Sequence, residues 1–310
     1  VRTGAGTPYG VFTPFWNACR QLPAPRAPLP EPRTLAGPAS APASDDLADW
    51  ELLPTRPDWA AGLRERWTPG EVGARARLRE FLGEDAADYD RARDEPAAGA
   101  TSLLSPRLRW GELSPFQVWH AAVGSDEPVG GFLSELGWRE FAWHTLFHFP
   151  DLATKNLRSA FDAFPWPPLR PTHLRAWQRG ETGIALVDAG MRELWATGFM
   201  HNRVRMVVAS FLVKNLLIDW RRGEEWFWDT LVDADAANNP FNWQWVAGSG
   251  ADAAPYFRIF NPELQAKKFD ADGRYVREWA PESAAREPIV DLAASRKAAL
   301  AAYEAVKRAG

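Results

Sequence analysis

The sequence predicts a mostly helical protein, on three observations. Apolar residues recur at helical spacing from about residue 112 onward, alternation of period two is scarce, and no strand–helix–strand series occurs. The 310 residues are 46% hydrophobic, which is enough for one large domain or two ordinary ones. The single cysteine, Cys19, cannot form an internal disulfide or a cluster of thiolate metal ligands.

The N-terminal part is expected to contain a connector followed by short helices. Prolines would break any regular element after residue 20, at positions 23, 25, 28, 30, 32, 38 and 42. Residues 21–45 are therefore predicted to be a connector. The motif Thr68-Pro69-Gly70-Glu71 resembles a helix N-terminal cap ahead of an arginine-rich helix. Ser114 and Pro115 are expected to be the cap and the first residue of another helix.

Further helices are expected over residues 132–148, 183–197, 202–220 and 288–308. In the 202–220 segment, apolar residues cover nearly the whole helix surface, and they include Val204, Val207, Val208, Phe211 and Leu212. A helix of this kind is buried, so it is predicted to lie at the centre of a large core. The alanine-rich 288–308 helix is expected to pack at the C-terminal end with its basic residues on a solvated face.

Composition excludes several classes of protein. No apolar run reaches about 18 residues, so no transmembrane helix is expected, and the absence of a signal-peptide pattern predicts a cytoplasmic location. Gly4-Ala5-Gly6-Thr7 follows no strand and is no dinucleotide-binding loop, and there is neither a Walker motif nor an internal repeat. A net charge of −4 excludes a polycationic nucleic-acid coat but allows a local basic site.

Tryptophan and arginine are over-represented. The 17 Trp accompany only 5 Tyr and 3 Met, and they could serve the interior, a stacking surface or redox chemistry. Lysine occurs only at positions 155, 214, 267, 268, 297 and 307. Arginine suits planar, bidentate contacts to carboxylates and phosphates. A genome that prefers Arg and Ala codons would give the same bias, so composition leaves both questions open.

Two helix faces combine polar groups in patterns that either ordinary packing and ion pairing or a bound ligand would explain. Glu135, Trp138 and Arg139 lie at positions i, i+3 and i+4 and share one face, although a surface ion pair beside a packed indole has the same pattern. Polar residues at the mouth of the buried helix need an internal partner or a ligand. These residues, which also share a face, are Asn202, Arg205 and Met206.

The densest polar cluster spans residues 233–245, with the sequence Asp-Ala-Asp-Ala-Ala-Asn-Asn-Pro-Phe-Asn-Trp-Gln-Trp. Such crowding of acids, amides and indoles makes a poor core helix and a poor simple turn. Acid pairs often bind metals, but the later ligand positions of an EF-hand are missing. Carboxylates and amides beside aromatics also suit a large polar cofactor. Trp243 and Trp245 are two residues apart and are expected to face different surroundings.

Two further patterns are less specific. Residues 99–106, Gly-Ala-Thr-Ser-Leu-Leu-Ser-Pro, offer hydroxyls and backbone N–H groups ahead of a helix. Such segments bind phosphates but are also common as capped loops. His144 and His148 are four residues apart, yet they lack the metalloprotease glutamate and are expected to pack. No metal site is predicted.

Taken together, these segments resemble the helical FAD-binding domain of the photolyase/cryptochrome family, over essentially the whole chain. The matching blocks lie at residues 6–16, 101–106, 138–141, 176–183, 187–192, 200–206, 233–245 and 253–262. So many blocks in one order are far more specific than a single motif. The implied fold is a mostly α, FAD-binding domain that lacks the family's N-terminal α/β antenna domain.

The resemblance implies a folded, U-shaped FAD deep in the helical domain, in its reduced form FADH⁻ when active. The matching cofactor-binding positions are Tyr89, Thr101, Ser102, Leu104, Ser105, Phe132, Arg139, Asn202, Arg205, Asp233, Asp235 and Asn239. Those from 89 to 105 are expected at the phosphates and sugar, and Arg205 is expected to pair with Asp233. Asn239 matches the position beside flavin N5, where photolyases usually have Asn, plant cryptochromes Asp and animal cryptochromes Cys.

The resemblance also implies UV-damaged DNA as the partner. The positions that match contacts to a flipped-out cyclobutane pyrimidine dimer and its DNA are Arg93, Glu135, Trp138, Asn202, Arg203, Met206 and Trp245. Stacking on indoles offsets the cost of extruding the damaged pair, about a few kcal/mol. The Met200-His201-Asn202-Arg203 pattern favours the cyclobutane-dimer class over the (6-4) class. The expected reaction is light-driven electron transfer from FADH⁻ to the dimer, ring splitting and electron return.

Tryptophans supply most of the expected catalytic set. Trp243 and Trp220 match two members of the family's photoreduction chain, and Trp166, one residue off the gapless alignment, is the nearest candidate for the outer member. Glu135 and Asn239 complete the set. Two kinds of departure from the family pattern are found. Leu103 stands where the family usually has Arg, and aromatic residues other than Trp stand where Trp is common, at Phe132 and Phe199.

The resemblance predicts a Pro-rich connector from the missing antenna domain over residues 1–50 and a helical catalytic domain over residues 51–310. The antenna pigment, a folate or a deazaflavin, cannot be assigned. We expect a monomer with no membrane attachment and no obligate protein partner. Two alternative hypotheses are a cryptochrome-like blue-light photosensor that signals to a protein partner, and a non-catalytic FAD-binding remnant. Asn239 and the complete set of lesion-contacting positions favour DNA repair.

Overall fold

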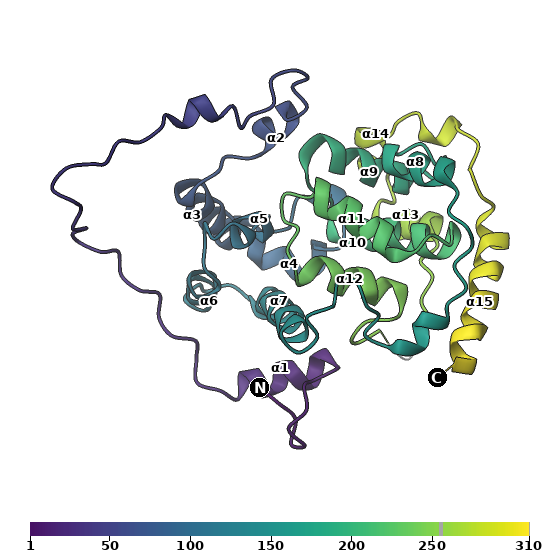
Figure 1. Ribbon diagram of the computed structural model, residues 1–310, viewed down its shortest axis with the longest axis horizontal. Coiled ribbons are helices and arrows are strands. Elements are labelled where there is room, and N and C mark those ends of the chain that lie inside the picture. The colour runs from purple at the N-terminus through teal and green to yellow at the C-terminus, as the bar shows by residue number, and fades with distance from the viewer. Residues whose placement is uncertain (254–256, 310) are drawn as a thin grey trace.

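The helices fall into two groups that face each other, as the computed structural model shows (Figure 1). The model describes residues 1–253 and 257–309, and within them every regular element is helical. The predicted mostly α class is therefore confirmed. None of the described helices is long and apolar enough to cross a membrane. Ala254, Pro255 and Tyr256, which belong to the 253–262 block, lie outside the described residues.

The first group precedes residue 150. Short 3-10 and π-helical turns connect several of its members, including a π turn at Phe81–Asp85. The helices are α1 (Phe12–Arg20), α2 (Ala61–Arg66), α3 (Glu71–Glu80), α4 (Tyr89–Ala92), α5 (Ser105–Arg109), α6 (Pro115–Val123) and α7 (Gly130–His148).

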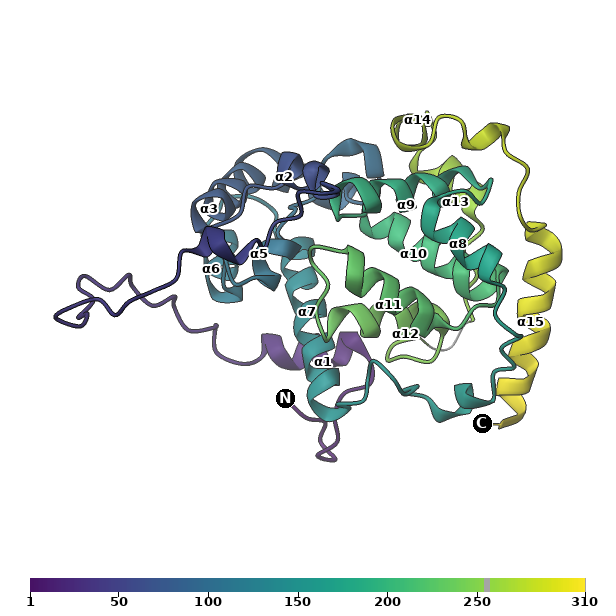
Figure 2. The same cartoon turned by 45° about the horizontal axis from the view of Figure 1, so that its top comes forward.

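The second group contains the main core, and the long α15 runs along its outer edge (Figures 1 and 2). The basic residues of α15, at positions 296, 297, 307 and 308, are exposed, as expected. The helices are α8 (Pro171–Arg179), α9 (Ala185–Thr197), α10 (Asn202–Ser210), α11 (Trp220–Thr230), α12 (Asn238–Ala247), α13 (Pro262–Phe269), α14 (Arg274–Trp279) and α15 (Leu292–Ala309).

The proline-rich segment forms a long excursion away from the helical body (Figures 1 and 2). Residues 23–46 contain no helix, and the first element after them is a 3-10 turn at Leu47–Trp50. Closely spaced prolines remove backbone donors and fix φ, which prevents a helix from propagating. The connector expected at residues 21–45 is therefore irregular along most of its length.

Helix starts were predicted with mixed success. Ser114 forms a capping box with Gln117: its Oγ accepts from Gln117 N at 3.2 Å, and Gln117 Oε1 accepts from Ser114 N at 2.8 Å. The arginine-rich helix α3 is also present and begins at Glu71. Its expected side-chain cap is wrong, because the capping position is Gly70 and no side-chain bond is made there. The Gly70 N–H donates instead to Glu112 at 2.6 Å, from a distant loop.

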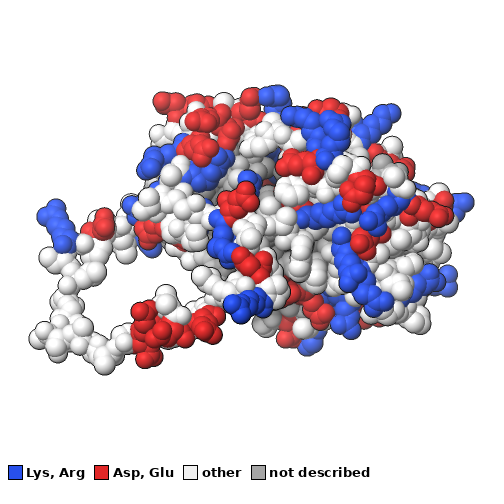
Figure 3. Space-filling model, turned by 90° about the horizontal axis from the view of Figure 1, so that it is seen from above, with Lys and Arg blue, Asp and Glu red and all other residues white. Residues whose placement is uncertain are grey.

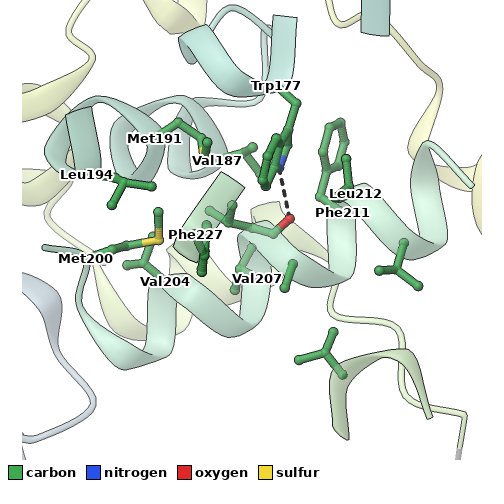
Figure 4. Packing of buried hydrophobic residues seen from close by; sticks show 14 of the residues in the cluster. Trp177, Val187, Met191, Leu194, Met200, Val204, Val207, Phe211, Leu212 and Phe227 are labelled. Carbon is green, nitrogen blue, oxygen red and sulfur yellow. Dashed lines mark hydrogen bonds between the residues drawn. The ribbon is translucent and has the colours of Figure 1, made fainter. Parts of the chain in front are cut away.

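The main core is formed where α9 crosses α10 (Figure 4). Trp177 is fully buried beside this crossing and donates its indole N–H to the carbonyl of Val208 at 3.2 Å. The close approach depends on Gly190, because a Cβ at this position would lie 2.4 Å from Val204 Cγ1. The central buried helix predicted from residue 202 is present through Asn215, as α10 followed directly by a π-helical turn.

The predicted 202–220 helix is wrong only over residues 216–219, where the helical conformation is interrupted. α10 ends at Ser210, a π-helical turn covers Phe211–Asn215, and Leu217 then adopts φ +51°. A new helix, α11, begins at Trp220, with Asp219 capping it through Arg221 N at 3.0 Å. The apolar pattern does not mark this break, since the residues around it are largely buried.

The 233–245 cluster corrects a second expectation. Residues from Asn238 onward form the buried helix α12, although the composition was judged poor for a core helix. Asp235 precedes it, and its Oδ1 accepts from the backbone N–H groups of residues 237 and 238 at 2.8 and 2.6 Å. The polar residues thus organise the helix start. Trp243 is buried and Trp245 half-buried, so the expected difference between them is confirmed.

Candidate functional site

A large cavity lies between the two helix groups, with a volume of about 520 Å³. This volume lies in the range of small-molecule and cofactor sites, about 300–1,000 Å³. Every predicted site residue lines it except Trp166 and Trp220. These lining residues are Tyr89, Arg93, Thr101, Ser102, Leu104, Ser105, Phe132, Glu135, Trp138, Arg139, Asn202, Arg203, Arg205, Met206, Asp233, Asp235, Asn239, Trp243 and Trp245.

One wall of the cavity is a polar loop, residues 101–105, which we call the hydroxyl loop. Ser102 Oγ accepts from Leu104 N at 3.4 Å, and Leu104 is buried behind the loop. Leu103 adopts φ +54°, a left-handed conformation that costs a residue with a Cβ about 1–2 kcal/mol. Strain of this kind persists only where the surrounding structure imposes it.

Asp233 and Arg205 form a buried ion pair next to the hydroxyl loop. Both terminal nitrogens of Arg205 donate to the Asp233 carboxylate, at 3.0 and 2.9 Å, and Ser105 Oγ donates to it at 2.6 Å. The Asp233 side chain is only 4% exposed. Arg205 Nε donates to the Met200 carbonyl at 2.6 Å. The expected pairing is therefore present, with the guanidinium fixed on both sides.

Asn239 lies on α12 with its amide oriented by Glu224 of α11. Its Nδ2 donates to the Glu224 carboxylate at 2.9 Å and to the Glu224 carbonyl at 3.1 Å. This assignment of the amide leaves the Asn239 carbonyl oxygen for the cavity. Burial raises the pKa of Glu224 to about 6, although the bond from Asn239 opposes the shift. Sequence reasoning missed Glu224, which no local motif marks.

Two ion pairs that the sequence did not reveal lie on the side of the cavity where the carboxylates are more exposed, which we call its mouth. Arg93 contacts Glu135 at 2.7 Å, and Arg203 contacts Asp94 at 2.6 Å. Arg203 also lies over the ring of Phe269, with 4.4 Å from its Cζ to the ring centroid. Asp94 was missed, and its position directly after Arg93 was the only available signal. The face in Figure 3 likewise shows basic and acidic side chains side by side.

The start of α10, beside the mouth, depends on His201. Its Nδ1 accepts from Arg203 N at 3.2 Å and thereby caps the helix. Burial lowers the pKa of His201 to about 4, so the ring is neutral at pH 7. The guanidinium of Arg203 is therefore positioned without an added charge from the adjacent imidazole.

Two indoles at the mouth differ in their support. Trp138 is stacked on Phe12, with 3.8 Å between ring centroids and 11° between planes. Trp245 stacks loosely near Phe260, at 6.4 Å and 25°, and Arg258 Cζ lies 5.3 Å from its ring centroid. Trp138 is therefore tied to the first helix of the chain, whereas Trp245 packs against the main core of the second helix group.

Trp243 connects the cavity to the second helix group. It lies edge-to-face with Phe227 at 4.9 Å and with Trp177 at 6.3 Å between ring centroids. A Cβ on Gly223 of α11 would lie 2.1 Å from Trp243 Cη2, so the indole packs directly on that backbone. Trp220 is one turn earlier on the same helix and therefore shares that face.

Two predicted residues, Trp220 and Trp166, do not line the cavity. Trp220 is only 1% exposed and donates its indole N–H to Asn156 Oδ1 at 3.0 Å. Trp166 is half-buried and packs on Phe164, with 4.3 Å between ring centroids. Neither is positioned to touch a ligand in the cavity.

The cavity fits a long ligand with an anionic end and a planar ring. Its hydroxyl loop offers Ser and Thr hydroxyls, and the neighbouring Asp233–Arg205 pair suits sugar-like hydroxyls. Aromatic and apolar side chains, including Phe132, Phe227 and Trp243, form much of the remaining surface. The carboxylates of Asp233 and Asp235 both accept hydrogen bonds from other residues of the chain. These bonds occupy the oxygens that such an acid pair would offer to a metal.

Comparisons with known proteins agree with this geometry. The family profile described as "FAD binding domain of DNA photolyase" matches residues 132–287. A deoxyribodipyrimidine photo-lyase of Agrobacterium fabrum is 50% identical over 99% of this chain and 71% of its own length. Cryptochrome-1 of Arabidopsis thaliana is 36% identical over 89% of this chain and 42% of its own length.

A solved structure gives the same result. The crystal structure of a class III photolyase from Agrobacterium tumefaciens superposes with a TM-score of 0.94, at 50% identity, over 99% of this chain and 70% of that one. The chain thus spans less than three quarters of each of these longer relatives, and it matches them across its helical body. The chain belongs to the photolyase/cryptochrome family.

Proposed function

We propose that this chain binds FAD and carries out light-driven repair of cyclobutane pyrimidine dimers in DNA. One observation carries the proposal: the residues that match the cofactor site and those that match the lesion site line one continuous cavity. An electron donor held by the first set would be adjacent to an acceptor held by the second. When bound, reduced FAD supplies the light-excited electron that opens the cyclobutane ring.

The inner part of the cavity is proposed to hold the cofactor. The hydroxyl loop and Tyr89 contact its phosphates and sugar, and backbone N–H groups in such a loop complement negative charge. The Asp233–Arg205 pair, with Asp235 and Asn202, surrounds the ribityl and ring region. Arg139 and Phe132 of α7 close the opposite side. Because Asp233 already has three donors, its orientation is fixed before any ligand enters.

Asn239 is proposed to present its carbonyl oxygen to the flavin N5 side. Glu224 occupies the amide nitrogen at 2.9 Å, so the oxygen is the group that remains free to accept a hydrogen bond. An amide held in this way accepts a bond from an N–H group but has no acidic proton to return. This arrangement suits a reduced flavin, and it favours repair over the photosensor alternative.

The mouth of the cavity is proposed to receive the flipped-out dimer. Trp138 and Trp245 stack against the two pyrimidines, and each stacking contact contributes about 1–3 kcal/mol. The Glu135 carboxyl hydrogen-bonds the dimer, and the Met206 thioether packs against it. Arg93, Arg203 and Asn202 contact the nearby backbone. The indoles and the thioether exclude water from the ring that is to be split.

We also propose that Trp243, Trp220 and Trp166 conduct electrons to oxidised flavin. The packing of Trp243 on Gly223, one turn from Trp220, supports the first step. Trp220→Phe should slow photoreduction of the oxidised flavin while leaving repair by chemically reduced protein intact. Transient absorption after a blue-light pulse measures the first quantity, and thymine restoration measures the second. Trp195→Phe, an exposed indole outside this set, is the matched control; unchanged photoreduction in Trp220→Phe would exclude the chain.

The deciding experiment uses the protein reconstituted with FAD, reduced with dithionite and illuminated with dimer-containing single-stranded DNA. Restored thymines are quantified, with a dark sample and a Glu135→Gln variant alongside. We expect light-dependent repair that falls strongly in the variant. Flavin binding without repair would reject the proposed activity, and the photosensor hypothesis would remain. Failure to bind FAD would reject both.

A further inference from the structure

Arg77 of α3 stands directly behind the hydroxyl loop, outside the cavity. Its Nε donates to the Ser102 carbonyl at 3.0 Å, and one terminal nitrogen donates to the Thr101 carbonyl at 3.1 Å. The same nitrogen contacts Asp85 at 2.6 Å, and the other contacts Glu80 at 3.0 Å. The guanidinium is 17% exposed and engages partners on each of its nitrogens.

These contacts fix the direction in which the loop presents its backbone. Two successive carbonyl groups, at 101 and 102, point outward to the guanidinium. Leu103 then adopts the left-handed conformation, φ +54°, and Leu104 the right-handed one, φ −92° and ψ −8°. A left-handed residue followed by a right-handed one turns successive N–H groups to the same side and forms an anion-binding concavity. The residues that form this concavity line the cavity, and one of its N–H groups, that of Leu104, also reaches Ser102 Oγ at 3.4 Å.

The strain at Leu103 explains why such an anchor is needed. Leucine has no preference for positive φ, and neither glycine nor asparagine occupies the position. The loop keeps this conformation only if its flanking peptides are held. Arg77 holds the two peptide groups that precede Leu103. The chain after Leu103 is held by the Ser105 hydroxyl, which donates to Asp233 at 2.6 Å. A planar fork with fixed donor directions suits this task better than a lysine would.

We infer that Arg77 is a positioning residue that presets the hydroxyl loop for the diphosphate of the bound cofactor. The inference rests on the proposed function, because it takes FAD as the ligand. Arg77 itself contacts no ligand and acts through the carbonyls of residues 101 and 102. It should therefore affect recognition of the phosphates and leave recognition of the flavin ring unchanged.

The test compares Arg77→Gln with Arg75→Gln on the same helix. Arg75 is half-exposed and, among the residues that the structure describes, pairs with Glu71 alone, so its loss leaves the loop intact. Dissociation constants are measured by flavin fluorescence for FAD and for riboflavin, which has the same ring but no phosphate. We expect Arg77→Gln to weaken FAD binding at least about tenfold, as for loss of charged hydrogen bonds, with riboflavin affected less than about threefold. Arg75→Gln should behave as wild type.

Two further measurements make the outcome unambiguous. The ³¹P resonances of bound FAD should shift in Arg77→Gln while the visible flavin spectrum is unchanged. Arg77→Lys, which keeps the charge but loses the fork, should weaken FAD binding to an intermediate extent and serves if the glutamine variant does not fold. Equal weakening of FAD and riboflavin, or unchanged FAD affinity, would overturn the inference. If wild-type protein does not bind FAD, the proposed function fails instead.

Discussion

The inner wall and the mouth of the cavity are built from the same residue types but held in different ways. In the inner wall, the Asp233 carboxylate is 4% exposed and accepts from two residues, Arg205 and Ser105. At the mouth, the carboxylates of Glu135 and Asp94 are 36% and 41% exposed, and each is held by one arginine. The arginines of the two regions are similarly exposed, so the difference lies in the carboxylates, which are buried in the inner wall and open to water at the mouth.

This difference distinguishes a site whose side chains are fixed before a ligand binds from a site whose ion pairs can exchange partners when a ligand arrives. A buried ion pair is costly to break, because removal of one partner leaves a charge without solvent. An exposed pair contributes little and reforms with other partners at small cost. The inner wall is therefore suited to a ligand that stays bound, and the mouth to one that arrives and leaves. The following predictions test that distinction, from the largest expected effect to the smallest.

Arg205→Met should show the greatest loss. It leaves Asp233 buried with one remaining side-chain donor, Ser105, and should lower the free energy of unfolding by about 3–5 kcal/mol. FAD uptake should fall with it. Denaturant unfolding and flavin titration measure the two effects. Arg93→Met at the mouth is the matched control and should cost about 1 kcal/mol or less; equal destabilisation by both variants would contradict the distinction between the regions.

Trp245→Ala should weaken binding of dimer-containing DNA by about 1–3 kcal/mol, roughly 5- to 150-fold, through loss of one stacking contact. FAD uptake should be unchanged, because Trp245 lies at the mouth. Fluorescence anisotropy with damaged and undamaged oligonucleotides measures the loss. Trp138→Ala should weaken DNA binding too but also destabilise the fold, since its ring stacks on Phe12 at 3.8 Å. DNA affinity that is unaltered in Trp245→Ala would remove this residue from the proposed lesion site.

The sequence predicted the helical class and the grouping of the cavity residues well. Motifs on regular helices succeed because spacing alone determines which side chains share a face, as for Glu135, Trp138 and Arg139. The Ser114 cap was also predictable, since all its partners are within three residues. The resemblance to a known family extended this to positions whose spacing carries no signal, such as Tyr89.

The missed site residues all depend on contacts between distant segments. Glu224 reaches Asn239 from another helix, and Asp94 reaches Arg203 across 109 positions. Arg77 occurs among several similar arginines, and only the fold selects it. The break after Asn215 was missed because the residues around it are largely buried, so their apolar side chains continue the pattern of the helix. Periodicity reports burial, and burial does not distinguish a helix from a buried turn.

Glu224→Gln tests how the inner wall responds to pH. The carboxyl has a folded-state pKa of about 6, against an ordinary value of 4.5, because burial disfavours its charge. The native state therefore binds the proton more tightly, and the free energy of unfolding falls as pH rises from 4.5 to 6. The variant lacks this penalty and should be more stable at pH 7.5 by at most about 2 kcal/mol, with no difference at pH 4. Denaturant unfolding across this range measures the gain; a gain that is independent of pH would argue against a raised pKa.

Asp94→Asn should give the smallest effect and tests the exchangeable mouth most directly. The Asp94 carboxylate contacts the Arg203 guanidinium at 2.6 Å, so a DNA phosphate must displace this carboxylate to reach the guanidinium. With the carboxylate removed, Arg203 has one more contact to offer. The slope of log affinity against log salt should steepen by about 0.7–0.9, and undamaged DNA should gain more than damaged DNA, because the phosphate contact carries no information on the lesion. Anisotropy titrations at several salt concentrations measure the slope, with Asp90→Asn, which forms no ion pair among the described residues, as the control. Weaker binding of both DNAs in Asp94→Asn would instead show that Asp94 orients Arg203 for DNA, and the mouth would then be as preset as the inner wall.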